Sequence, residues 1–133
     1  MLKRLSLIVA VIGSPAYAIE LCGSGARINC IVDGDTFWLD GEKIRAVGYD
    51  TPEPMTNICG GATERQLAHQ ASQRLLQLFN ETEISIQRQG QDRYGRTLAE
   101  VFADGVNVGD ILVSEGLARF WPDGCEFWCG SCS

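Results

Sequence analysis

The chain has 133 residues, of which 45% are hydrophobic and 21% are charged, with a formal net charge of −6. This length suits one domain with its own core, and the acidic balance argues against a protein that holds long nucleic acid by charge alone. The single histidine, His69, excludes mechanisms that use two histidines as acid and base, and we expect it to be an exposed helix residue.

The first eighteen residues have the pattern of a cleavable secretory signal peptide. A basic start at residues 3–4 precedes an apolar run at 5–11, which is too short to span a membrane, and Ala-Tyr-Ala at 16–18 is a small-x-small cleavage site. We therefore predict cleavage after residue 18, a secreted or periplasmic location, and a single mature domain over 19–133. Cleavage would remove two basic residues and no acidic one, which takes the net charge from −6 to −8.

All six cysteines follow the predicted cleavage site, and an even number in an exported chain predicts disulfide bonds, with fifteen possible pairings. The candidates are Cys22, Cys30, Cys59, Cys125, Cys129 and Cys132. The last three belong to a cysteine-rich tail at 120–133, for which a zinc site or a redox motif is the alternative. No histidine lies nearby to complete a common zinc ligand set.

Three successive strands are predicted over residues 27–32, 36–39 and 42–49. Asp-Gly turn signals separate them, which is typical of strands joined by tight hairpins. The Thr-Pro-Glu-Pro segment at 51–54 ends the third strand, because proline lacks a backbone donor and restricts the residue before it.

Apolar residues at helical spacing then predict an amphipathic helix over 63–79, whose first residue is the N-cap of a capping-box pattern. Strands at 83–88 and 96–103 flank a polar loop. Asn107 is placed to cap a short helix over 108–115. The remainder of the chain is turn-like.

The order of three strands, helix, two strands and helix predicts a mainly β protein with helices, of the α+β class. A five-stranded Greek-key barrel of the oligonucleotide-binding (OB) type accommodates this order, with a helix between the third and fourth strands. Two to three α-helices are expected in all.

Two carboxylates, one before the second predicted strand and one after the third, are candidates for holding a hard divalent cation. Asp35 lies at the tip of one turn and Asp50 at the end of a later strand, with the Thr51 carbonyl as a further oxygen. Taken alone, the Asp-Gly-Asp sequence is better explained as a hairpin turn, and Asp33 is expected to be a turn residue or an outer contact of the metal. An EF-hand is excluded, because Phe37 occupies its third ligand position.

Arginines form a second group of candidates. The guanidinium fork binds two phosphate oxygens at once, so Arg45 on a strand and Arg96 after a glycine turn could approach one phosphate from two sides. Glu53 lies in a rigid Pro-Glu-Pro segment, where it could accept a proton from an attacking water molecule or orient that water. For either arginine alone, a solvated strand residue is the alternative.

Together these motifs resemble the thermonuclease (staphylococcal or micrococcal nuclease-like) family. The resemblance covers roughly residues 28–119, and its motifs lie at 32–36, 44–45, 50–53, 92–99 and 115–118. It implies an oligonucleotide-binding barrel and calcium-dependent hydrolysis of DNA and RNA to products with a 3′-phosphate and a 5′-hydroxyl.

The resemblance also implies a role for each matched residue. The matched calcium ligands are Asp35, Asp50 and the Thr51 carbonyl. The matched phosphate-binding arginines are Arg45 and Arg96, and the matched general base or water-orienting group is Glu53. The positions that contact the terminal phosphate and nucleotide are Arg93 and Tyr94.

Two features differ from the family pattern: the acidic charge, and a Phe-Trp-Pro segment with a cysteine tail beyond Arg119. Trp121 is placed to stack on a base or, alternatively, to pack in the core or within the tail. We expect a monomer that acts on DNA and RNA, preferably single-stranded or flexible, and that does not associate with membranes after cleavage. The alternative is a non-catalytic OB-type barrel that binds nucleic acid or protein around a structural ion, which would not require Arg45, Glu53 and Arg96 together.

Overall fold

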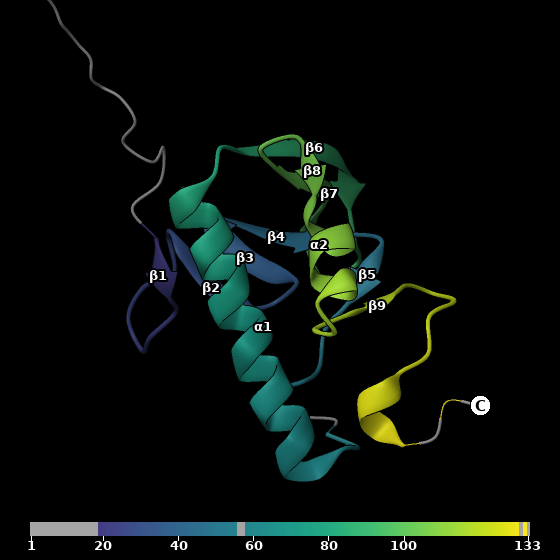
Figure 1. The fold of residues 1–133 in the computed structure, drawn as a ribbon. Coiled ribbons are helices and arrows are strands. Elements are labelled where there is room, and N and C mark those ends of the chain that lie inside the picture. Colours follow the sequence, from purple (N-terminus) through teal and green to yellow (C-terminus); the bar gives the residue numbers. More distant parts are fainter. Residues whose placement is uncertain (1–18, 56–57, 131, 133) are drawn as a thin grey trace, which may run out of the picture.

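The computed structural model of the chain describes residues 19–55, 58–130 and 132 (Figure 1). The predicted signal peptide and its cleavage site lie outside these residues. Neither α-helix in the described part of the chain is both long and apolar enough to cross a membrane. The elements are β1 (Glu20–Leu21), β2 (Cys30–Asp33), β3 (Thr36–Leu39), β4 (Glu42–Ala46), β5 (Tyr49–Asp50), α1 (Gly61–Glu81), β6 (Ile84–Gln91), β7 (Thr97–Ala103), β8 (Val106–Asn107), α2 (Val108–Ser114), β9 (Arg119–Phe120) and the 3-10 helix η1 (Phe127–Cys129).

Most strands join one mixed sheet with the hydrogen-bonded order β1-β2-β3-β4-β7-β6, and β8 pairs with β7. The meander β2-β3-β4 is antiparallel, whereas β4 and β7 run parallel. A parallel pair needs a crossover connection, and here α1 and β6 lie between the two strands in the chain. The third predicted strand therefore pairs with the fifth. The mixed sheet with its two α-helices confirms the α+β class and the OB-like arrangement.

The core lies between the sheet and α1, which extends along one side of it (Figure 1). Leu75 and Phe79 of α1 are fully buried, as their helical spacing predicts. The ring of Phe79 packs edge-on against Phe37 of β3, with 4.8 Å between centroids. His69 is exposed on α1, as expected from the sequence.

The third predicted strand, at 42–49, is shorter than expected. Gly48 has a φ of +90°, which favours glycine and breaks the strand into β4 and β5. β5 leaves the main sheet and pairs with β9, so that Asp50 lies opposite Arg119. This break directs Asp50 toward the C-terminal part of the chain.

Two other boundaries differ from the predictions. The first predicted strand, at 27–32, is reduced to β2, and β1 adds a short parallel strand beside it. The capping box at Thr63 is wrong: α1 begins at Gly61, Gly60 is its N-cap, and no side chain of the N-cap residue caps it. Asn107 is confirmed as the cap of α2, because its side chain accepts a hydrogen bond from the Asp110 N–H at 3.3 Å.

All six cysteines are paired, as predicted, in the disulfides Cys22–Cys30, Cys59–Cys129 and Cys125–Cys132. Cys129 and Cys132 are therefore not bonded to each other, and the redox motif considered for this pair is not formed. No thiol of the tail is left to bind zinc.

Glu42 links three strands at one end of the sheet. Its carboxylate accepts hydrogen bonds from Arg88 of β6 and from Thr97 of β7, each at 2.7 Å. These bonds lower the pKa of Glu42 from 4.5 to about 2. Because the pKa is lower in the folded state, the stabilisation is present above the unfolded pKa near 4.5 and is lost as the pH falls toward 2.

We expect Glu42→Gln to lower the free energy of unfolding at pH 7 by about 0.2–1 kcal/mol, the range measured for exposed ion pairs. The difference from the wild type should shrink as the pH falls from 4.5 toward 2. Urea unfolding at several pH values measures both effects. Glu83→Gln is the control, because it removes the same charge at an exposed position; an equal loss in that variant would contradict the prediction.

Candidate active site

Asp35 reaches the site because the turn between β2 and β3 packs closely on β5 and α1. A Cβ atom at Gly34 would lie 2.6 Å from Thr51 Cγ2 and 2.8 Å from Ala71 Cβ, so the backbone approaches both segments at this glycine. The buried Tyr49 hydroxyl donates a hydrogen bond to the Gly34 carbonyl at 2.8 Å and ties the turn to β5.

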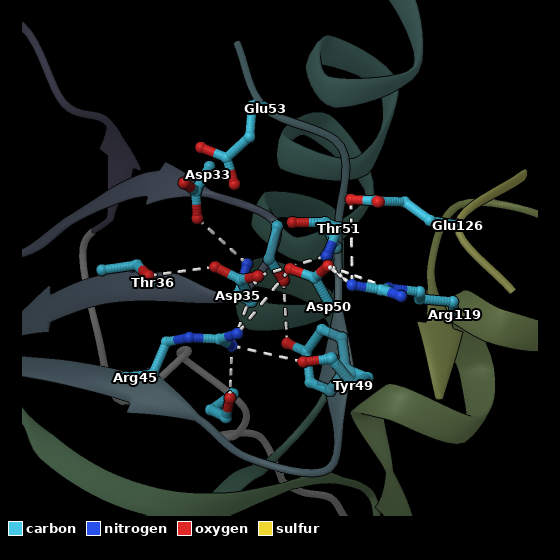
Figure 2. A network of polar contacts seen from close by, with 12 residues as sticks. Asp33, Asp35, Thr36, Arg45, Tyr49, Asp50, Thr51, Glu53, Arg119 and Glu126 are labelled. Atoms are coloured by element: carbon cyan, nitrogen blue, oxygen red, sulfur yellow. Dashed lines mark hydrogen bonds and ion pairs between the residues drawn. The ribbon is translucent and has the colours of Figure 1, made fainter. Parts of the chain in front are cut away.

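The Asp35 side chain is 7% exposed, and its carboxylate receives donors from three segments (Figure 2). The Thr36 hydroxyl donates to Oδ1 at 3.0 Å, and the Thr51 N–H donates to Oδ2 at 3.2 Å. The Arg45 guanidinium forms an ion pair with Oδ2 at 3.3 Å. This carboxylate therefore has a restricted orientation.

Arg45 lies on β4 directly opposite Thr36 of β3. Its Nη1 donates to the carbonyls of Ala46 at 2.6 Å and Tyr49 at 3.3 Å, and its Nη2 lies 3.8 Å from Asp50 Oδ1. The structure thus brings Asp35, Asp50 and Arg45 together as the sequence predicted. The guanidinium is largely buried and held on one side by these contacts.

Arg119 is a member of the site that sequence reasoning missed. Its Nε and Nη2 both lie 3.0 Å from Asp50 Oδ2, and Glu126 is 3.7 Å from Nη2 (Figure 2). The ion pair exists because β5 and β9 pair across 69 positions of the chain. No local pattern around Arg119 indicates this contact.

The acidic groups of the site raise one another's pKa values. Burial, followed by the charge of Asp35, raises the pKa of Asp33 from 3.8 to about 8. Burial and the charges of Asp35 and Asp50 raise that of Glu53 from 4.5 to about 6. The pKa of Asp50 is also raised, by burial first and then by Asp35. The site therefore has more carboxylate charge than its arginines offset.

Asp33 has the turn role expected for it. Its Oδ1 accepts a hydrogen bond from the Asp35 N–H at 3.2 Å, which is the pattern of an Asx turn. Its carboxyl group also lies close enough to Glu53 for their charges to interact, and the two side chains occupy the same side of the network in Figure 2.

The residues present fit a hard divalent cation such as calcium. Carboxylates from two segments, Asp35 and Asp50, converge at a partly buried point, and their like charges favour a cation between them. The adjacent Thr51 hydroxyl is buried and has no hydrogen-bond partner. Oxygen ligands of this kind are those that calcium prefers.

A cavity of about 440 Å³ opens beside this cluster. Its lining includes Arg45 from β4 and the loop residues Arg93, Tyr94 and Arg96, with Trp121 at the edge of the tail. The loop thus places its three predicted side chains beside Arg45. Trp121 is 54% exposed and faces this cavity, which favours the stacking alternative over packing within the tail.

Arg96 is held by its own loop. Its Nε donates to Asp92 Oδ2 at 2.7 Å, and its backbone N–H donates to Asp92 Oδ1 at 3.0 Å. Its guanidinium lies 5.6 Å from the ring centroid of Tyr94, whose hydroxyl accepts a hydrogen bond from Arg93 at 2.7 Å. Arg45, from β4, and Arg96, from the loop between β6 and β7, therefore face one cavity but have different carboxylate partners.

Glu64 of α1 is a second residue that was missed. Its carboxylate is fully buried and accepts a hydrogen bond from the Glu53 N–H at 2.8 Å. Helical spacing could have indicated it, because residue 64 lies on the same face as the buried positions 68, 71, 75 and 78. A charged residue on a core-facing stripe is a signal for a specific role.

Comparison with known proteins agrees with this arrangement. The model of the family described as Staphylococcal nuclease homologue matches residues 43–125. The thermonuclease of Staphylococcus intermedius is 31% identical over 115 residues, covering 77% of this chain and 64% of the relative. The endonuclease YncB of Bacillus subtilis is 35% identical over 96 residues, covering 66% and 44%.

The micrococcal nuclease of Shigella flexneri is 30% identical over 122 residues, which cover 84% of this chain and 64% of the relative. The chain thus spans less than two thirds of the length of each of these three relatives. The family match runs from residue 43 in β4 past β9 and includes all three arginines that line the cavity. The chain belongs to the Staphylococcal nuclease homologue family.

Proposed function

We propose that this protein is an exported, calcium-dependent nuclease that hydrolyses phosphodiester bonds of DNA and RNA. The observation that carries the proposal is the buried Asp35 carboxylate paired with Arg45, at the edge of the cavity that Arg96 also lines. The nuclease names of the relatives support the reaction class.

The two arginines are assigned to the phosphate. Charge builds up on the phosphoryl oxygens when water attacks phosphorus in line and the bond from phosphorus to the 5′ oxygen breaks, which leaves a 3′-phosphate and a 5′-hydroxyl. Donors that are already oriented stabilise this charge best, and contacts with carboxylates and carbonyls hold both Arg45 and Arg96 in place. A calcium ion bound by Asp35, Asp50 and Thr51 would supply Lewis-acid polarisation of the phosphate.

Glu53 is assigned to the attacking water. Its pKa of about 6 leaves it mostly ionised at neutral pH, so it can accept the water's proton or orient the water by a hydrogen bond. The 5′ oxygen takes a proton from solvent as it leaves. Arg93 and Tyr94 line the cavity that Arg45 and Arg96 also line, and they are assigned to binding of the neighbouring phosphate and nucleotide.

The substrate range and location follow from the same features. The assigned groups act on phosphate, which supports hydrolysis of both DNA and RNA. The acidic net charge of −6 supports a preference for short or flexible single strands, because affinity for long duplexes depends on positive charge. Three disulfides, together with the signal-peptide pattern, support a secreted or periplasmic location. We expect the protein to act there as a monomer.

Digestion of single-stranded DNA and RNA with calcium or with a calcium chelator tests the proposal. We expect cleavage with calcium, its loss with the chelator, and products that carry 3′-phosphates. Arg96→Ala should lower the rate by about 10²–10³-fold, as for loss of one oriented donor. Arg74→Ala is the matched control, because Arg74 pairs with Glu115 outside the cavity.

Three outcomes would contradict the proposal. Intact nucleic acid in the presence of calcium would indicate a binding module rather than an enzyme. Equal cleavage with the chelator would reject the metal dependence. Equal activity of Arg96→Ala and Arg74→Ala would reject the role of Arg96.

A further inference from the structure

The buried carboxylate of Glu64 has more hydrogen-bond donors than the N-terminal cap of a helix requires. The side chain is 0% exposed, and three backbone N–H groups donate to it. Oε1 accepts from Cys59 at 2.7 Å and from Gly60 at 2.8 Å, whereas Oε2 accepts from Glu53 at 2.8 Å. All three donors lie in the segment that leads from the site into α1.

These donors compensate the burial of the charge. Burial alone raises the pKa of a carboxyl group, but the bonds from the Glu53, Gly60 and Cys59 N–H groups outweigh it and hold the pKa of Glu64 below its usual value. Glu64 therefore remains a carboxylate in the folded protein. An ionised group with each oxygen bonded to backbone donors has a well-defined position.

The two oxygens of Glu64 hold different parts of the chain. Oε1 fixes residues 59 and 60 at the start of α1, where the Cys59–Cys129 disulfide also connects this segment to the tail. Oε2 fixes only the backbone of Glu53. Capping of α1 accounts for the first set of bonds and does not account for the second.

We propose that Glu64 is a positioning residue, which holds the Glu53 backbone so that the Glu53 carboxylate stays beside the Asp35–Arg45 cluster. This proposal rests on the nuclease function proposed above and on the assignment of Glu53 to the attacking water. Glu64 is not one of the residues that line the cavity. Its effect on the reaction therefore passes through Glu53.

Glu64→Gln is the most selective variant. A glutamine of the same size has one acceptor oxygen and one NH2 donor, so it cannot accept from both sides. At least one set of backbone donors then loses its partner. We expect kcat to fall by about 10- to 100-fold, the scale for a small misplacement of a reacting group. KM and the calcium Kd should stay within about twofold of the wild type, since Arg45, Arg96 and the metal ligands are untouched.

A double-mutant cycle separates positioning from a general structural role. If Glu64 acts through Glu53, adding Glu64→Gln to Glu53→Gln should lower kcat no further. Hydrogen exchange of the Glu53 amide should be faster in Glu64→Gln, a readout that does not depend on activity. Glu81→Gln, at the far end of α1, is the matched control.

If Glu64→Gln unfolds at the assay temperature, Glu64→Asp replaces it, because aspartate keeps the charge and is too short to reach both sets of donors.

The outcomes distinguish the two proposals. An inactive wild type would reject the nuclease function itself. If the wild type is active, any of three results for Glu64→Gln would reject the positioning role. These are an unchanged kcat, a further fall in kcat when the substitution is added to Glu53→Gln, and unchanged hydrogen exchange of the Glu53 amide.

Discussion

Arg45→Lys is expected to lower kcat/KM for single-stranded DNA by about 10²–10³-fold in saturating calcium, which corresponds to about 2.7–4 kcal/mol of barrier. Lysine keeps the positive charge beside Asp35 and Asp50. It loses the planar fork, which can bond the Ala46 and Tyr49 carbonyls and still present donors to a phosphate. The predicted loss of kcat/KM therefore reports the contribution that the planar shape of the guanidinium makes to catalysis, separately from that of its charge.

The measurement is steady-state cleavage of a labelled oligonucleotide, with thermal unfolding of each variant to confirm the fold. Arg74→Lys is the matched control, because it makes the same exchange in an ion pair between α1 and the residue that follows α2. A loss of less than about threefold in Arg45→Lys, with the fold intact, would show that Arg45 only neutralises the two carboxylates.

Asp35→Asn should abolish cleavage and remove the stabilisation that calcium gives the folded protein. Asparagine keeps the size of the side chain and an acceptor for Thr51, but it removes the charge that a cation needs. Calcium at one hundred times its Kd should raise the free energy of unfolding of the wild type by about 2.7 kcal/mol relative to the protein in chelator. We expect no such increase in Asp35→Asn.

Thermal unfolding with calcium and with chelator measures the effect without any assay of activity. Asp110→Asn, at an exposed position in the first turn of α2, is the control and should retain the full calcium shift. Calcium-dependent stabilisation of Asp35→Asn equal to that of the wild type would place the cation elsewhere. Loss of the shift in Asp35→Asn, with catalysis retained, would separate the metal from the reaction.

Local patterns in the sequence predicted much of the fold. Two Asp-Gly turns predicted the meander, and the helical spacing of Leu75 and Phe79 predicted α1, because both patterns depend on neighbours along the chain. The Asn107 cap was predicted for the same reason. The boundaries near Gly48 and Gly61 were wrong, since a backbone φ above zero is not specified by apolar periodicity.

The residues of the site were also predicted in part from local patterns. Asp35, Arg45, Asp50 and Glu53 lie within nineteen positions, and turn chemistry together with the family resemblance identified them. Their roles as ligands, phosphate-binding group and base remain predictions that the variants above test. What the sequence alone determined about this protein is therefore the order of its main strands and two α-helices along the chain and the residue types of its site.

Only the tertiary structure decided how these residues are supported. Arg119 meets Asp50 because β9 pairs with β5, and Glu64 reaches Glu53 because α1 packs back on the segment before it. Arg96 comes to the cavity of Arg45 because β4 and β7 pair in parallel after a long crossover. Such contacts depend on the packing of the whole chain, and no local pattern records them.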